Sequence, residues 1–260
     1  MIKLVHISDL HFHQDRKDNT AIHNMLLGVM NEYFLSGTNY LLVTGDIVDD
    51  GDRTQYALAF EALNPFGRRV LVCPGNHDYG PFGVMYSESS AHYFDTMLAG
   101  PLGYRHPYCS KVPMVRILQD GQGSKLMTIG VNAVLETSSP FDFSCGEIGE
   151  SQLEQLSTVL SSPEYATVPK LVYLHFHPFM RDNFTMKLRD SEAFMTLLDG
   201  RVQVLCFGHE HVRELWKDKA GTGIQWILAS GKSPEADHVF EIAVEGSQVT
   251  VNDSVVASIP

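Results

Sequence analysis

Cysteine is scarce in this chain of 260 residues. The four cysteines, Cys73, Cys109, Cys145 and Cys206, are far apart in the sequence and form no CxxC pair. Their spacing indicates neither a zinc ribbon nor a disulfide scaffold. The simplest interpretation is a protein of the reducing cytoplasm.

Positive charge is also in short supply. The chain has 19 Lys and Arg against 31 Asp and Glu, with a formal net charge of -12 at pH 7. This balance argues against a broad surface for nucleic acid or anionic membrane, because both partners need clustered basic residues. A small anionic substrate is still compatible with it, since bound divalent cations reverse the charge of a local site.

Long apolar runs are missing. No run approaches the roughly 18 apolar residues that span a bilayer, and the amino-terminal apolar run is too short for a secretory signal. Hydrophobic residues nevertheless make up 44% of the chain, which is ample for a core. Without an internal repeat or a convincing linker, we expect one domain over residues 1–260.

Apolar periodicity predicts alternating strands and helices, with a hairpin near the carboxyl end. The expected strands are 2–7, 40–44, 69–73, 125–134, 170–174, 202–207 and 225–228, with a hairpin of 239–244 and 248–252 around Gly246; the expected helices are 19–35, 54–62, 149–160 and 191–198. The opening 2–44 therefore reads as a βαβ unit.

Residues 81–123 are the least periodic part of the chain. They contain several glycines, prolines and tyrosines, together with His92 and His106. Long irregular excursions usually carry function, so we expect a lid-like or substrate-binding insertion here. The two histidines are more simply read as solvated or structural.

The central motif is the strand ending Leu41-Leu42-Val43-Thr44-Gly45-Asp46. A glycine at a strand end lets the chain turn sharply, so Asp46 should project from the carboxyl edge of a sheet, where α/β folds place ligands. Four other strands also end in Asp, Asn or His. Each of these motifs is weak alone, and their conjunction is strong.

The five strand ends together supply two carboxylates, one amide and four imidazoles. The predicted metal ligands are Asp9, His11, Asp46, Asn76, His175, His209 and His211. His177 would face the same side as His175 if the segment stayed extended, and it is the reserve ligand. Mixed oxygen and nitrogen ligands suit Mn, Fe, Zn or Co better than Ca or Mg.

These motifs resemble the calcineurin-like metallophosphoesterase superfamily, whose pattern is DxH, GDxxD, GNH[DE], H and GHxH in this order. The corresponding residues are Asp9 to His11, Gly45 to Asp49, Gly75 to Asp78, His175, and Gly208 to His211. The resemblance spans about residues 3–245. It is closest to the branch that hydrolyses cyclic nucleotides and glycerophosphodiesters.

The resemblance implies an α/β (α+β) fold of two packed mixed sheets flanked by helices, a four-layer αββα sandwich. It also implies two transition-metal ions and a small phosphodiester substrate. Asp9, His11, Asp46 and His211 would hold one ion, and Asp46, Asn76, His175 and His209 the other. Two ions about 3.5 to 4 Å apart would generate a hydroxide for in-line attack on phosphorus.

Carried over from the family, His77 would bind the phosphoryl group and protonate the leaving alkoxide, and Asp49 would orient His77. Asn76 and His77 are therefore the expected substrate contacts. His177 and His13 are further candidates. His13 and Phe176 also depart from common versions of the motifs.

One departure bears on the substrate. Protein phosphatases of this superfamily usually have GDxVDRG, whose arginine clamps a phosphomonoester dianion, whereas this chain has Asp50 at that position. The resemblance therefore favours a phosphodiesterase over the alternative, a phosphomonoesterase or protein phosphatase. A non-catalytic scaffold is a further alternative, but every motif ligand is retained.

Overall fold

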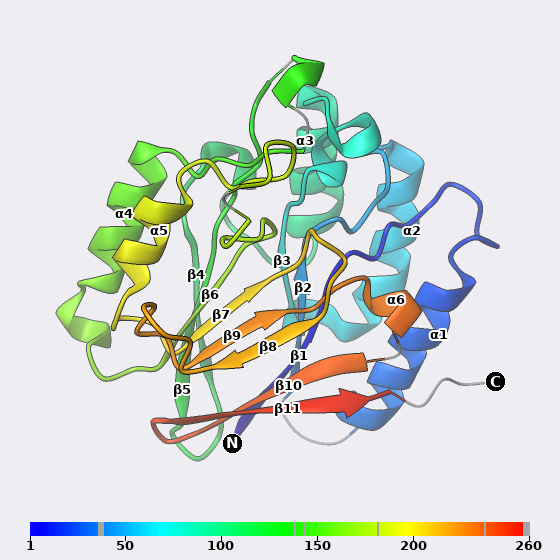
Figure 1. Ribbon diagram of the computed structural model, residues 1–260. Coiled ribbons are helices and arrows are strands. Elements are labelled where there is room, and N and C mark those ends of the chain that lie inside the picture. Colours follow the sequence, from blue (N-terminus) through cyan, green and yellow to red (C-terminus); the bar gives the residue numbers. More distant parts are fainter. Residues whose placement is uncertain (36–38, 138, 143, 181, 237, 257–260) are drawn as a thin grey trace.

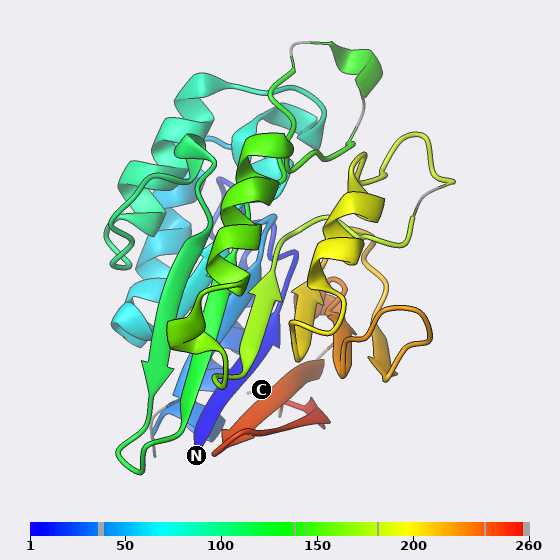
Figure 2. The ribbon, with the colours of Figure 1, turned by 90° about the vertical axis from the view of Figure 1, so that its left-hand side faces the viewer.

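The computed structural model describes residues 1–35, 39–137, 139–142, 144–180, 182–236 and 238–256. Two mixed sheets form the centre of the molecule, with helices on either side (Figures 1 and 2). The first sheet has the order β11-β10-β1-β2-β3, and the second has the order β4-β5-β6-β7-β9-β8. This architecture confirms the predicted pair of mixed sheets flanked by helices.

The first sheet combines the two ends of the chain. Strands β1, β2 and β3 are parallel, and the hairpin β10-β11 adds to β1 in the antiparallel direction. The strands are β1 (Ile2–Ile7), β2 (Asn39–Thr44), β3 (Val70–Cys73), β10 (His238–Glu245) and β11 (Gln248–Val255). Buried positions run through β1, β2 and β3, as expected of strands covered on both faces.

The second sheet is parallel at its centre and antiparallel at both edges. Strands β5, β6, β7 and β9 are parallel, while β4 and β8 run against β5 and β9. The strands are β4 (Met114–Gln119), β5 (Lys125–Gly130), β6 (Lys170–Tyr173), β7 (Val204–Phe207), β8 (Glu214–Lys217) and β9 (Trp226–Ala229).

The four longer helices lie on the outer faces of the sheets. Figure 1 shows α1 and α2 on the side of β1 to β3, and α4 and α5 on the side of β5 to β7. The helices are α1 (Thr20–Val29), α2 (Arg53–Leu63), α3 (Glu88–Tyr93), α4 (Glu150–Leu160), α5 (Ser191–Leu198) and α6 (Ser233–Ala236). Each of the four long helices turns an apolar side toward the core and a polar side outward.

Tyrosine hydroxyls join the free edge of the first sheet to the second. Tyr104 Oη accepts from Val72 N at 2.7 Å and lies 3.0 Å from Tyr173 Oη, while Tyr108 Oη donates to Val72 O. All three rings are buried. Because β3 is an edge strand, these hydroxyls satisfy backbone groups that another chain would otherwise pair with.

Several predicted boundaries need correction. The strand expected over 125–134 ends at Gly130, because the Asn132 side chain then accepts from Val134 N and turns the chain. The helix expected over 19–35 changes at Met30 into a π-helical turn. Strands β4 and β8 were not predicted; both are edge strands with exposed positions, which weaken their apolar pattern.

The expectation of an irregular excursion over 81–123 is wrong for most of its length. The segment includes α3, the π-helical turn Phe94–Ala99 and strand β4, and it buries Phe94, Leu98 and Tyr108. Its aromatic side chains pack into the core without a regular period. A role as a lid stays a prediction. Gly83, in the first part of the segment, lies close to Asn76 and His77.

Candidate metal centre

The carboxyl ends of five parallel strands bring the predicted ligands into contact. Within each of three groups, ligand atoms from every member lie within 4.8 Å of one another. The groups are Asp9, His11 and His211; Asp46, His175 and His209; and His11, Asp49 and His77. Segments up to 202 residues apart thus meet at one edge of the two sheets.

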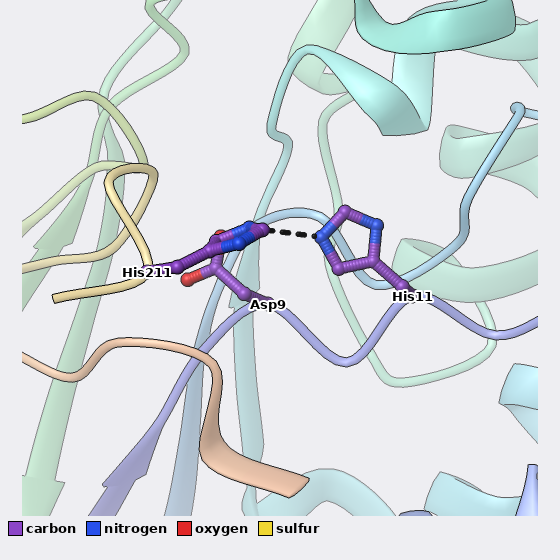
Figure 3. Close-up of side chains that lie close together, drawn as sticks. All are labelled: Asp9, His11 and His211. Carbon is purple, nitrogen blue, oxygen red and sulfur yellow. Dashed lines mark hydrogen bonds and ion pairs between the residues drawn. The ribbon is translucent and has the colours of Figure 1, made fainter. Parts of the chain in front are cut away.

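The first group joins the segments that follow β1 and β7. His11 Nε2 lies 3.3 Å from His211 Nε2, and His211 Nε2 lies 3.6 Å from Asp9 Oδ1. Figure 3 shows the two rings directed toward each other beside the Asp9 carboxylate. Asp9 is buried, and its carboxylate accepts from the backbone of His209 at 3.2 Å.

The second group lies deeper. His175 Nε2 is 3.1 Å from Asp46 Oδ2 and 3.1 Å from His209 Nδ1. His175 Nδ1 donates to Thr44 O at 2.8 Å, which fixes the ring with Nε2 toward Asp46. A backbone carbonyl on the far nitrogen is the usual support of a metal-binding histidine.

Asp46 connects the two groups. Its Oδ2 lies 3.1 Å from His175 Nε2 in one group and 3.9 Å from His11 Nε2 in the other. Its Oδ1 instead accepts from His77 N at 3.0 Å. One oxygen therefore faces both groups while the other holds the carboxylate in place.

Asn76, the predicted amide ligand, has an unused acceptor. Its Nδ2 donates to Gly83 O at 3.0 Å, whereas its buried Oδ1 has no hydrogen-bond partner. Leaving a buried amide oxygen unpaired costs roughly 1 to 3 kcal/mol. A metal ion would satisfy this oxygen, so the donor set fits metal binding as a whole.

The backbone is strained at five of the predicted ligands. Among the described residues other than glycine, positive φ occurs at eight positions, and five of them are predicted ligands: Asp9, His11, Asp46, His209 and His211. Such conformations cost about 1 to 3 kcal/mol each and persist where the surroundings impose them. Backbone hydrogen bonds supply part of that constraint, with His11 N donating to Asp46 O at 2.9 Å.

Glycines make room for the carboxylates. A side-chain carbon at Gly75 would overlap with Asp46 Oδ1, and one at Gly208 would overlap with Asp9 Oδ2. Gly45, at φ 84°, also faces the ring of His175, with 2.5 Å between its added carbon and Nδ1. The motif glycines are therefore needed for two reasons. A larger side chain would overlap with the neighbouring carboxylates and imidazole, and glycine lets the chain turn at the strand end.

The structure modifies the role expected of Asp49. Its Oδ1 lies 3.0 Å from His11 Nδ1 but 4.0 Å from His77 Nδ1, and its Oδ2 lies 3.4 Å from His13 Nδ1. His77 Nδ1 donates instead to the backbone carbonyl of Asp49 at 2.7 Å. Asp49 thus orients His77 through its main chain, and its carboxylate supports His11.

His177 does not join either ligand group. It is buried among Phe179, Phe207 and Trp216, and its Nε2 lies 3.4 Å from Glu214 Oε2. The expectation that it faces the same side as His175 assumed an extended segment. Strand β6 ends at Tyr173, so that alternation does not hold.

Asp78, the last residue of the GNHD motif, is a supporting residue that was not predicted from the sequence. It is fully buried, and it accepts from Ile47 N and Val48 N at 3.0 Å and from Gly75 N at 2.8 Å. Burial and the neighbouring Asp46 raise the pKa of Asp78 to about 7. Its position directly after Asn76 and His77 was the available signal that it supports the two loops.

The surroundings of the two buried histidines shift their pKa values in opposite directions. Burial alone would lower the pKa of His175, but Asp46 and Asp9 outweigh it and raise the pKa to about 9. Burial together with the charge on His175 lowers the pKa of His209 to about 3. Without metal, His175 therefore carries a proton at neutral pH and His209 is neutral.

Comparison with known proteins agrees with this geometry. The sequence profile of the calcineurin-like phosphoesterase family matches residues 2–213, which include every predicted ligand. The chain belongs to the calcineurin-like phosphoesterases. It is therefore a hydrolase of phosphoester bonds from a metal-dependent family, and its clustered histidines and aspartates are able to bind metal.

Two proteins named as cyclic nucleotide phosphodiesterases are similar to most of this calcineurin-like phosphoesterase. The chain is 25% identical over 224 residues to the 3′,5′-cyclic adenosine monophosphate phosphodiesterase CpdA of Haemophilus influenzae, covering 81% of this chain and 70% of that protein. It is 24% identical over 216 residues to a probable cyclic nucleotide phosphodiesterase of Vesicomyosocius okutanii, covering 80% and 78%.

Solved structures support the fold of this calcineurin-like phosphoesterase. A dimetal phosphatase from Danio rerio aligns with a TM-score of 0.57 at 15% identity, covering 98% of this chain and 99% of that one. The calcineurin-like phosphoesterase YfkN from Bacillus subtilis aligns with a TM-score of 0.55 at 12% identity, covering 98% and 91%. No helix in the described part of the chain has the length and hydropathy needed to cross a membrane.

The close approach of Gly75 to Asp46 gives a first prediction. Gly75→Ala should displace the Asp46 carboxylate and weaken metal binding by about 10- to 100-fold, the range seen when groups supporting a metal ligand are disturbed. Isothermal titration of the metal-free protein with Mn²⁺ measures this. Gly121→Ala is the matched control, because no heavy atom lies within 4 Å of its added carbon; equal affinities of both variants would contradict the prediction.

The raised pKa of His175, about 9, gives a second prediction. A metal ligand must be a neutral imidazole, so binding at neutral pH has to displace its proton, and the apparent metal affinity should rise from pH 7 toward pH 9. Calorimetric titration in two buffers of different ionisation enthalpy measures the proton release. Release that does not diminish above about pH 9, or that is missing at about pH 7, would show that His175 is not the group concerned.

Proposed function

We propose that this chain is a phosphodiesterase with two metal ions held around Asp46. Asp9, His11, Asp46 and His211 would hold one ion, and Asp46, Asn76, His175 and His209 the other. The observation that carries the proposal is Asp46 Oδ2, which faces ligand nitrogens of both groups at 3.1 and 3.9 Å. Bound ions of this kind supply Lewis-acid chemistry and a nucleophile formed from water near neutral pH.

The mixed donors favour particular metals. Imidazole nitrogens outnumber carboxylates in the combined set, which suits Mn, Fe, Zn or Co better than Ca or Mg.

The cytoplasmic location expected from cysteine usage is part of the same proposal. Four cysteines that are all free thiols support it.

His77 is the proposed acid for the departing oxygen. Its Nδ1 donates to Asp49 O, so the other ring nitrogen is left for the substrate. The side chain is 25% exposed, unlike the buried ligands Asp46 and His175, which places it at the boundary between the site and solvent. From there it would donate a hydrogen bond to the phosphoryl group and a proton to the leaving alkoxide.

A small diester is the substrate class that the charges favour. Asp50 replaces the arginine that clamps a dianion in related protein phosphatases, and Arg53 is exposed at the start of α2. A diester carries one negative charge at its phosphate, so it suffers less repulsion from Asp50 than a monoester dianion does. Similarity to proteins named as cyclic nucleotide phosphodiesterases supports this choice.

Parallel assays of the manganese-loaded protein test the substrate class. We expect bis(p-nitrophenyl) phosphate to be hydrolysed with a kcat/KM about tenfold or more above that of p-nitrophenyl phosphate, because the missing arginine and the Asp50 charge both disfavour the dianion. Faster hydrolysis of the monoester would instead establish the phosphomonoesterase alternative. Turnover of neither, with less than about one ion bound per chain, would favour a non-catalytic scaffold.

His77→Ala tests the acid. The variant should bind metal as the parent does, because His77 lies outside both proposed ligand sets, and it should lose roughly 10²- to 10⁴-fold in kcat toward diesters. Metal analysis and steady-state kinetics measure the two properties. His92→Ala on α3 is the matched control; if the two variants kept the same kcat, His77 would have no catalytic role.

A further inference from the structure

A cavity of about 390 Å³ lies at the end of the second sheet opposite the candidate metal centre. Its lining includes Lys170, the first residue of β6, and Gln203, which directly precedes β7. The proposed ligands His175 and His209 follow the carboxyl ends of the same two strands, so the sheet separates the cavity from the metal centre. The volume is within the range of about 300 to 1,000 Å³ that small-molecule sites usually have.

Lys170 brings a buried positive charge to this cavity. The residue is only 5% exposed, and its Nζ donates to Tyr165 O at 2.8 Å and to Val168 O at 3.2 Å. Both partners are neutral, and among the described residues no carboxylate lies within ion-pair distance of the ammonium. Burial lowers the pKa of Lys170, since no nearby negative charge compensates for the lost hydration.

A buried lysine without a counter-ion is unusual, because ammonium groups are almost never buried unless they are paired. An ammonium has three N–H donors, and the two carbonyls use two of them. One donor and one positive charge of Lys170 are therefore left for a ligand in the cavity.

A second cation lines the same cavity. Arg201 is exposed, and no carboxylate in the described ranges of the chain pairs with its guanidinium. The other polar residues of the lining include four with hydroxyl groups: Ser161, Ser162, Thr167 and Ser247. None of the described residues that line the cavity is Asp or Glu. The cavity is thus locally positive in a chain whose formal net charge is -12.

The neighbouring structure keeps this positive lining in place. Asp199 directly precedes Gly200 of the lining, but its carboxylate faces another loop, where a side-chain carbon at Gly223 would lie 2.0 Å from Asp199 Oδ1. Trp226 Nε1 donates to Val249 O at 3.2 Å, which holds the β10-β11 hairpin against the second sheet. Ser247, in the turn of that hairpin, is thereby held at the cavity wall.

We propose that this cavity binds a small dianion, namely a phosphate group that is either free or carried by a small organic molecule. Lys170 and Arg201 would match its two negative charges, and the hydroxyl groups would donate hydrogen bonds to its oxygens. A cation would be repelled by the same two side chains. The site is separate from the metal centre, so the inference does not depend on the proposed phosphodiesterase function.

NMR titration of the full chain tests the site. Inorganic phosphate is added at neutral pH to the isotope-labelled, zinc-loaded protein, because zinc ions do not broaden the signals. We expect saturable shifts of the backbone amides of Ser161, Thr167 and Gln203, which report this cavity separately from the metal centre. Glycerol, which is uncharged, should not shift them. Propylphosphonate is the second probe: tighter binding than phosphate would indicate an organic ligand, and weaker binding would indicate free phosphate.

Charge-removing variants identify the groups that bind. Arg201→Gln and Lys170→Met should each weaken phosphate binding at these three amides by about tenfold or more, because hydrogen bonds to charged groups are the strong ones. Lys125→Gln is the matched control, since Lys125 is also the first residue of a strand in this sheet but is exposed and does not line the cavity. Its affinity should equal that of the parent protein.

Two results would overturn the inference. One is the absence of saturable shifts at the three amides in the parent protein. The other is equal phosphate affinity of Arg201→Gln and Lys125→Gln. Arg201 is exposed, so this comparison holds even if Lys170→Met fails to fold after losing its two hydrogen bonds to carbonyls.

Discussion

The shared carboxylate of Asp46 is the interaction on which the rest of the site depends. One oxygen is held by His77 N, and the other faces ligand nitrogens that arrive from β1 and β6. A buried carboxylate is costly unless it is paired with an opposite charge. Burial alone would raise the pKa of Asp46, but His175 and His77 outweigh it and hold that pKa well below its usual value, so the carboxylate stays ionised and able to bind cations.

Holding Asp46 there requires an environment that tolerates strain. Left-handed backbone at five ligands and an unpaired amide oxygen at Asn76 all oppose stability. Asp78 offsets part of this, because its buried carboxylate accepts three backbone hydrogen bonds from the loops that carry Asp46 and Asn76. The two sheets supply the remaining rigidity, since the strands leading into the ligands are buried along nearly their whole length.

Asp50 stands where related protein phosphatases have an arginine. Asp50 lies one position after Asp49, yet its carboxylate contacts Gln55 and the Phe82 backbone instead of the ligand groups. The charge of Asp50 disfavours a doubly charged phosphate at this position.

The sequence by itself determined the fold class and the five strand ends with the polar residues that follow them, because buried strands have a continuous apolar pattern and polar residues after them stand out. It could not place His177, the Asp49 carboxylate or Phe82, since their positions depend on where the chain leaves its regular geometry and on partners far away in sequence. Residues 88–119 were misjudged for a related reason: their aromatic side chains are buried by tertiary packing that has no sequence period. Only the tertiary structure decided which oxygen of Asp46 faces both ligand groups, because that depends on the approach of Gly75 and His77 from a separate strand.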